Sequence, residues 1–143
     1  MRQEEGAMIL CGGENLMDLL PEAPDPAATP DRALRFRAVP GGAPCNCARA
    51  LARLGTAAGY LAPVSTDAFG AALAEGLERD GVVLAGGRSD LPTALAVVTL
   101  TEGGPVYAFH REGTADRDVT PAGLLEALPE DAAALCLSGM ALA

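Results

Sequence analysis

The sequence contains no lysine and no tryptophan, and its 143 residues include only three phenylalanines, two tyrosines and one isoleucine, Ile9. The missing lysine excludes a P-loop lysine and Schiff-base chemistry. Because large aromatic side chains are scarce, alanine, leucine, valine and glycine must fill the core. Half of the residues are apolar, a fraction far too high for a disordered chain. Length and apolar content together predict one folded domain.

Long apolar runs and clustered basic charge are also missing. No apolar run approaches the roughly 20 residues that a membrane-spanning helix needs, and the first five residues are polar and acidic, unlike a signal peptide. All ten basic residues are arginines that form no basic stripe, and the formal net charge is −9. We therefore expect a cytoplasmic protein that binds neither a membrane nor a nucleic acid.

The four cysteines have the spacing of neither a disulfide scaffold nor a zinc ribbon. Cys45 and Cys47 form the only close pair, and no second pair or histidine lies near them in the sequence. Cys11 and Cys136 lie within apolar runs. We expect all four to be small buried side chains in a reducing compartment, with no metal site.

Short apolar runs alternate with stretches of helical spacing. The expected strands cover residues 7–11, 34–39, 60–64 and 132–137, and a hairpin covers 94–109. Helices are expected to begin near Pro44, Asp67 and Thr120, with Asp67 as an N-cap. This alternation predicts an α/β fold with a central, mostly parallel sheet flanked by helices.

Three further features complete this prediction. The proline-rich residues 21–33 are expected to form a surface loop. The strand 34–39 alternates apolar and basic residues, and with the hairpin it predicts a smaller accessory sheet. In the last helix, we expect Leu124, Leu125 and Leu128 to form the buried face, and the strand 132–137 to be buried as well.

Candidate ligand contacts gather after two strands. Asp18 follows a strand and the pair Gly12-Gly13, and its two oxygens can accept from neighbouring hydroxyls of a polyol or sugar, although it can equally cap a turn. Gly41 and Gly42 precede a helix, where glycine lets the backbone approach a ligand. Asn46 can donate to or accept from a hydroxyl, or act as a local cap.

Two residues near the hairpin's end complete the list of candidates. Arg111 can bind a carboxylate, a phosphate or a sugar oxygen, or remain an exposed charge. His110 is the only histidine. It has no paired serine or cysteine, and we expect it to be a surface residue.

In order along the chain, these segments resemble the PfkB (ribokinase-like) family of sugar kinases, most closely its fructokinase-like branch. The similar segments are residues 9–21, 40–55, 67–70, 92–96, 111–116 and 137–139. The resemblance implies a ribokinase-like fold and ATP-dependent transfer of the γ-phosphate to a sugar hydroxyl, with Mg²⁺.

Carried over by position, the resemblance implies that Asp18, Gly41, Gly42 and Asn46 contact sugar hydroxyls. Arg111 corresponds to a position that varies with the sugar. The segments 15–20, 34–39 and 92–98 would supply a β-sheet lid that closes over the sugar and excludes water. A second copy pairing through this lid sheet is an open alternative for a partner.

The family's D-T-x-G-A-G-D loop, which supplies the catalytic base and an anion hole, has no counterpart in these residues. The resemblance therefore assigns no catalytic residue, no ATP contact and no metal ligand here. We expect residues 1–143 to be the N-terminal portion of a single kinase domain, inactive alone.

Several alternatives stay open. One alternative to a fructokinase-like fragment is a non-catalytic sugar-binding or interaction module. Another is a kinase fragment that acts on 2-keto-3-deoxygluconate or ribose. A weaker alternative is an unrelated Rossmann-like nucleotide binder that uses Gly12-Gly13. The lack of an expected helix directly after these glycines argues against it.

Overall fold

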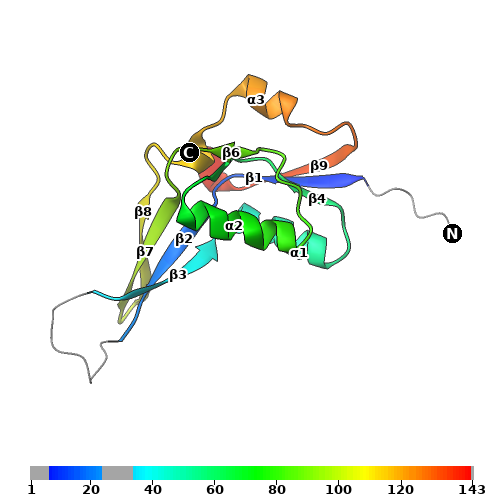
Figure 1. Cartoon of the computed structure of the whole chain (residues 1–143). Coiled ribbons are helices and arrows are strands. Elements are labelled where there is room, and N and C mark those ends of the chain that lie inside the picture. The colour runs from blue at the N-terminus through cyan, green and yellow to red at the C-terminus, as the bar shows by residue number, and fades with distance from the viewer. Residues whose placement is uncertain (1–6, 24–33, 143) are drawn as a thin grey trace.

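The structure, a computed structural model, describes residues 7–23 and 34–142, and its centre is a three-stranded parallel sheet of order β4-β1-β9 (Figure 1). The strands are β1 (Met8–Gly12), β4 (Ala58–Tyr60) and β9 (Ala132–Leu137). Helices α1 (Ala43–Arg53) and α2 (Ala68–Arg79) lie on one side of the sheet, and the short α3 (Pro121–Glu126) lies on the other (Figure 1). This arrangement confirms the predicted α/β class.

A second sheet, here called the outer sheet, extends away from the body (Figure 1). Its order is β3-β2-β7-β8, with β2 (Leu16–Pro21), β3 (Phe36–Gly41), β7 (Ala94–Thr101) and β8 (Gly104–His110). The expected hairpin is the antiparallel β7–β8 pair. Since β2 follows β1 after three residues, the chain passes directly from the central sheet into the outer sheet.

The remaining elements are short. Strands β5 (Val64–Ser65) and β6 (Arg88–Ser89) form a parallel pair, and 3₁₀ turns cover η1 (Ala115–Arg117) and η2 (Gly139–Leu142). No helix of the described ranges is long and apolar enough to cross a membrane.

The predicted helix starts are confirmed. Pro44 lies in the first turn of α1, where its missing N–H costs nothing. Asp67 caps α2 by accepting from the Gly70 N–H at 2.7 Å, and it also accepts from the Thr93 N–H and hydroxyl at 2.8 and 2.6 Å. Burial favours a higher pKa for Asp67, but the hydrogen bonds from Thr93 and Gly70 outweigh it and hold that pKa below its usual value.

The core lies between the central sheet and helices α1 and α2. Its members are mostly small, as the composition requires: Cys11, Met17, Cys45, Ala48, Tyr60, Ala62, Val64, Leu73, Ala74, Leu77 and Val82. The only large aromatic among them is Tyr60, which is fully buried.

Several sequence predictions are wrong in detail. The strand expected at 60–64 is two strands, because β4 ends at Tyr60 and β5 begins only at Val64, after Pro63, which has no N–H for a ladder. The loop expected at 21–33 begins with Pro21 still in β2, and from residue 24 it lies outside the described residues.

The burial predicted for the last helix and strand is also wrong. Leu125 and Leu128 are 70% and 40% exposed, Leu124 is half-buried, and every residue of β9 is exposed. Within the described ranges, α3 stands off the sheet across a cavity, so no element packs tightly on these apolar side chains. The cysteines differ from the prediction too, since Cys47 is half-buried and Cys136 is exposed.

Candidate functional site

The N-terminus of α1 and the inner face of the outer sheet enclose a cavity of about 180 Å³. Its lining comes from six elements or connections and consists of Glu14, Leu16, Asp18, Gly42, Ala43, Tyr107, Phe109 and Met140. Two carboxylates and two aromatic rings therefore face one small space.

Asp18 is the polar centre of this cavity. It lies on β2 between β3 and β7, opposite Val39 and Ala96, and it is half-buried. Burial raises the pKa of its carboxyl above the usual value. The described residues provide no hydrogen-bond donor to this carboxylate, so both oxygens are left to accept from a ligand.

The two glycines shape the wall beside Asp18. A Cβ at Gly41 would overlap Oδ2 of Asp18, so the carboxylate packs directly against bare backbone. Gly42 has a φ of 103° as the N-cap residue of α1, and a Cβ there would overlap the carbonyl oxygen of Glu14. Both positions therefore require glycine, one for contact with Asp18 and the other for its backbone conformation.

Glu14, which the sequence analysis missed, holds the cavity together. Its side chain is buried, its Oε1 accepts from the Ala43 N–H at 3.2 Å, and its Oε2 accepts from the Ser138 hydroxyl. A carboxylate at a helix N-terminus is favoured by the helix dipole and replaces the side-chain cap that Gly42 cannot give. Ala43 is 29 residues away in sequence, so no local pattern pairs it with Glu14.

The connection before Asp18 is fixed by a buried hydrogen-bond chain. The Asn15 Nδ2 donates to the Tyr60 hydroxyl at 3.2 Å and to the Pro63 carbonyl at 3.0 Å, and the Tyr60 hydroxyl donates to the Gly13 carbonyl at 2.7 Å. Burial raises the pKa of Tyr60, so the hydroxyl keeps the proton that it donates. This chain anchors the start of β2 and hence the position of Asp18.

Tyr107 and Phe109 form the aromatic wall and were not singled out from the sequence. They are two residues apart on β8, their ring centroids are 5.9 Å apart, and their planes differ by 11°. The period of two in a strand could have placed both on one face. Their partners on β7 are Val98 and Ala96, and Ala96 in turn pairs with Asp18.

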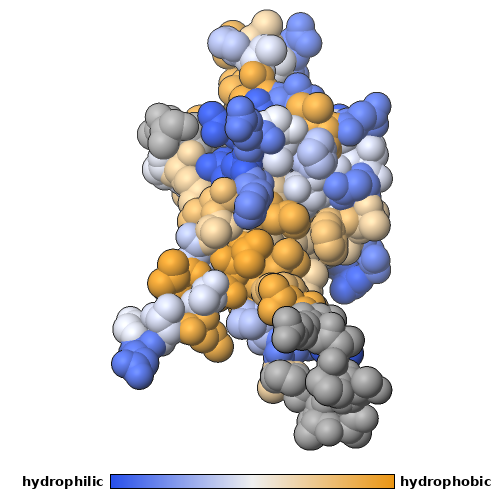
Figure 2. Space-filling model, turned by 90° about the vertical axis from the view of Figure 1, so that its left-hand side faces the viewer, coloured by the Kyte–Doolittle hydropathy of each residue, from blue (hydrophilic) through white to orange (hydrophobic). Residues whose placement is uncertain are grey.

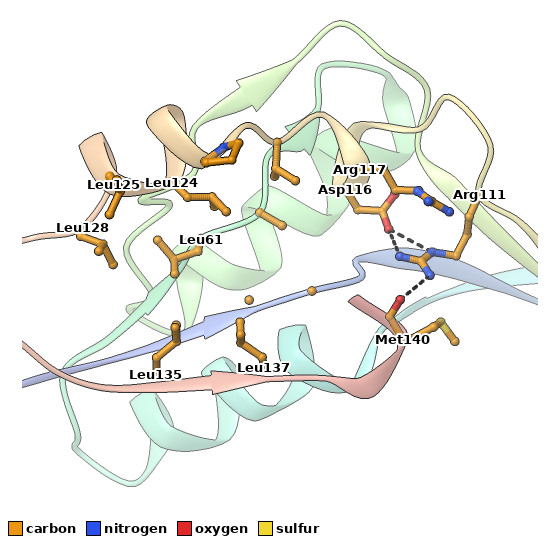
Figure 3. Close-up of a pocket in the computed structure, with 15 residues that line it drawn as sticks. Leu61, Arg111, Asp116, Arg117, Leu124, Leu125, Leu128, Leu135, Leu137 and Met140 are labelled. Atoms are coloured by element: carbon orange, nitrogen blue, oxygen red, sulfur yellow. Dashed lines mark hydrogen bonds and ion pairs between the residues drawn. The ribbon is translucent and has the colours of Figure 1, made fainter. Parts of the chain in front are cut away.

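Asn46 and Arg111 lie outside this lining. Asn46 is an exposed residue of α1 whose backbone N–H donates to the Gly42 carbonyl at 2.9 Å. The Arg111 Nε and Nη2 donate to Asp116 Oδ2 at 3.1 and 2.7 Å, and its Nη1 donates to the Met140 carbonyl at 3.3 Å (Figure 3). Met140 lines both cavities, so it connects Arg111 to the Asp18 cavity through one residue.

Arg111 belongs instead to a larger cavity of about 600 Å³ between α3 and the central sheet. Leucines from α3, β9 and the end of β4 converge on it, and the Arg111–Asp116 pair closes one end (Figure 3). Asp116 is fully buried and also accepts from the Thr114 hydroxyl at 2.6 Å. Arg117 also lines this cavity and is exposed, whereas the charges of Arg111 and Asp116 satisfy each other.

The smaller cavity does not suit a nucleoside triphosphate, because it presents two carboxylates, which repel phosphate. The larger cavity is lined by two arginines, of which Arg111 is paired with Asp116 and Arg117 is exposed. The described side chains gather no cluster of three or more carboxylates suited to Mg²⁺.

Comparison with known proteins matches this geometry to one family. The sequence fits the profile of the pfkB family carbohydrate kinases over residues 7–143. It is 36% identical over 139 residues to a fructokinase of Rhizobium leguminosarum bv. trifolii, covering 94% of this chain and 40% of the relative. It is 39% identical over 116 residues to the probable chloroplastic fructokinase-6 of Arabidopsis thaliana, covering 79% of this chain and 30% of the relative.

Solved structures are similar over the same region. A fructokinase from Xylella fastidiosa superposes with a TM-score of 0.75 at 33% identity, over 92% of this chain and 40% of that one. The same enzyme with bound ATP gives a TM-score of 0.74 at 34% identity, over 92% of this chain and 38% of that one. The chain thus spans well under half the length of these relatives. Its sequence match and its fold together show that it belongs to the pfkB family of carbohydrate kinases.

Proposed function

We propose that this chain supplies the sugar-recognition portion of a fructokinase-like enzyme, which transfers the γ-phosphate of ATP to a hydroxyl of fructose. The observation that carries the proposal is the Asp18 carboxylate, which faces a small cavity without a hydrogen-bond donor from the described residues. A carboxylate can accept from two adjacent hydroxyls, which is the arrangement that a sugar presents.

The surroundings of Asp18 support this role. The bare backbone of Gly41 and Gly42 admits a ligand close to the carboxylate. The stacked rings of Tyr107 and Phe109 supply an apolar wall, and they stand on the hairpin of the outer sheet. We infer that this sheet acts as the lid over the sugar. Asn46 and Arg111 would contact the sugar only after the lid or α1 shifts.

Fructose is proposed because the similar proteins of Rhizobium and Xylella are fructokinases. The family's chemistry uses ATP and Mg²⁺, and we propose no residue of this chain as a contact to either. We expect no turnover by these 143 residues alone.

Calorimetric titration of the chain with fructose, ribose and 2-keto-3-deoxygluconate tests the recognition role. We expect fructose to bind most tightly, and Asp18→Asn to weaken binding at least tenfold, because losing a charged hydrogen-bond partner costs about 1.5–3 kcal/mol. The matched control is Asp90→Asn, an exposed carboxylate outside both cavities. Equal affinities of Asp18→Asn and the unaltered chain would refute the proposal.

The pH dependence gives a second test. Asp18 accepts with both oxygens, in charge-assisted hydrogen bonds, only when it is ionised, and burial raises its pKa. Affinity for the sugar should therefore be full at neutral pH and fall as the pH drops through that raised pKa.

A coupled ADP-release assay distinguishes the kinase from the competing hypothesis of a non-catalytic module. The assay uses this chain joined to the C-terminal half of a fructokinase, which carries the catalytic base. Turnover supports the kinase, whereas sugar binding without turnover supports the module.

A further inference from the structure

Three of the four cysteines converge at one point of the central sheet. The sulfur atoms of Cys11, Cys47 and Cys136 all lie within 4.8 Å of one another, and the Cys47 and Cys136 sulfurs are 4.0 Å apart. They come from three elements, β1, α1 and β9. Cys11 and Cys136 are register partners on neighbouring parallel strands, so their side chains leave the same face, the one that α1 covers.

These distances match those of a three-thiolate metal site. Zinc–sulfur bonds are about 2.3 Å long, so three sulfurs around one ion lie about 4 Å apart. The Cys47–Cys136 pair already has this separation. No carboxylate or imidazole belongs to the group, so its donors are all soft and disfavour Mg²⁺ and Ca²⁺.

The burial of the three residues gives an entry path. Cys11 is fully buried, Cys47 is half-buried and Cys136 is exposed. An ion can therefore reach the cluster from the Cys136 side, and that side leaves a coordination position open to water. The fourth cysteine, Cys45, is buried in the core and outside the cluster, although it lies only two residues from Cys47.

We propose that Cys11, Cys47 and Cys136 form a binding site for a thiophilic divalent cation of the zinc class. Binding converts three thiols and one Zn²⁺ into a tris-thiolate complex of charge −1 and three released protons. The ion would tie α1 to β9. These are the elements that lead into the Asp18 cavity through Ala43 and Met140, so occupancy would stiffen that cavity's walls.

Metal binding to this cluster is expected to release protons, because zinc binds cysteine as the thiolate and not as the thiol. Each sulfur that coordinates the ion gives up its proton.

The test is calorimetric titration of the reduced 143-residue chain with Zn²⁺ in two buffers of different ionisation enthalpy. We expect one ion per chain and the release of close to three protons. The cadmium form should show ultraviolet thiolate-to-metal charge transfer, and the thermal midpoint should rise with Zn²⁺.

Variants distinguish this site from adventitious binding. Cys136→Ser changes an exposed side chain and should weaken Zn²⁺ binding at least about tenfold, since even indirect changes around a metal cost that much. Cys45→Ala removes a thiol of the same helix and should leave the affinity unchanged. Circular dichroism verifies that each variant is folded.

Three outcomes would overturn the proposal. The first is the absence of saturable Zn²⁺ binding by the unaltered chain. The second is equal affinity in Cys136→Ser. The third is a Cys47–Cys136 disulfide that forms when peroxide is added, together with no Zn²⁺ binding by the reduced chain. The cluster would then be a redox pair and not a metal site.

Discussion

At the scale of single residues, Gly42 carries two constraints at once. Its φ of 103° lies in the region that side chains rarely adopt, and its missing Cβ leaves room for the Glu14 carbonyl oxygen. Gly55 shares only the first constraint, because its φ is 85° and no atom lies within 4 Å of the place its Cβ would take. Comparing substitutions at the two positions therefore separates the effect of backbone strain from that of steric overlap.

We expect Gly55→Ala to lower the free energy of unfolding by about 1 kcal/mol, the cost of a left-handed conformation. Gly42→Ala should lower it by more than about 2 kcal/mol, because the Glu14–Ala43 connection must also move. Urea unfolding followed by circular dichroism measures both. Equal losses would mean that the Glu14 backbone moves away from the new Cβ at no cost in the free energy of unfolding, so that only the backbone conformation matters at Gly42.

The residues that could be predicted from sequence are those whose role depends on local conformation. Asp67 and Thr120 were expected at helix starts, and each accepts from the N–H three residues on. Glu14 was missed because its partners, Ala43 and Ser138, lie far along the chain. Tyr107 and Phe109 are local neighbours on β8, but they form a cavity wall only where β8 faces β2 and the N-terminus of α1.

At the scale of elements, α2 contains two glycines in opposite environments. Gly70 lies in the first turn of the helix, and a Cβ there would overlap the backbone carbonyl of Ser65 in β5. Gly76 begins the last turn of the same helix, and its Cβ would meet only the end of the Arg49 side chain, at 3.9 Å. Close packing of α2 on β5 therefore depends on one glycine and not on the other.

Alanine at the two positions should shift stability in opposite directions. We expect Gly76→Ala to stabilise the fold by about 0.5–1 kcal/mol, because alanine costs less backbone entropy in a helix. Gly70→Ala should destabilise it by about 1–3 kcal/mol, since the helix must move away from Ser65. Thermal unfolding of the two variants gives the comparison. Stabilisation by both changes would contradict the packing of α2 on β5.

Element types were more predictable than element burial. The apolar periodicity identified α3 and β9, but Leu125 and Leu137 are 70% and 48% exposed. Periodicity reveals which face a helix or strand would bury, whereas actual burial requires another element to cover that face. In the described ranges, α3 and β9 face each other across the 600 Å³ cavity and leave these side chains accessible.

At the scale of the whole molecule, the outer sheet has two edges of different character. The β3 edge carries Arg37 and Pro40, both of which discourage pairing with another strand. The β8 edge has one proline, Pro105, at its start and contains no acidic or arginine side chain, and Val106, Tyr107 and Phe109 are 55%, 49% and 48% exposed. Figure 2 views the molecule from the outer-sheet side and shows apolar side chains gathered over the middle and lower part of this face.

The missing lysine bears directly on this edge, because lysine is the residue that most often protects edge strands. We expect self-association through β8, so that light scattering gives a mass above 14.4 kDa that rises with concentration. Added salt should strengthen association by screening the repulsion between chains of net charge −9. Val106→Lys should restore the monomer, whereas Leu125→Lys, at an exposed apolar position on α3, should associate like the unaltered chain. If Leu125→Lys abolishes association and Val106→Lys does not, the contact lies at the α3–β9 face and the lid edge is free.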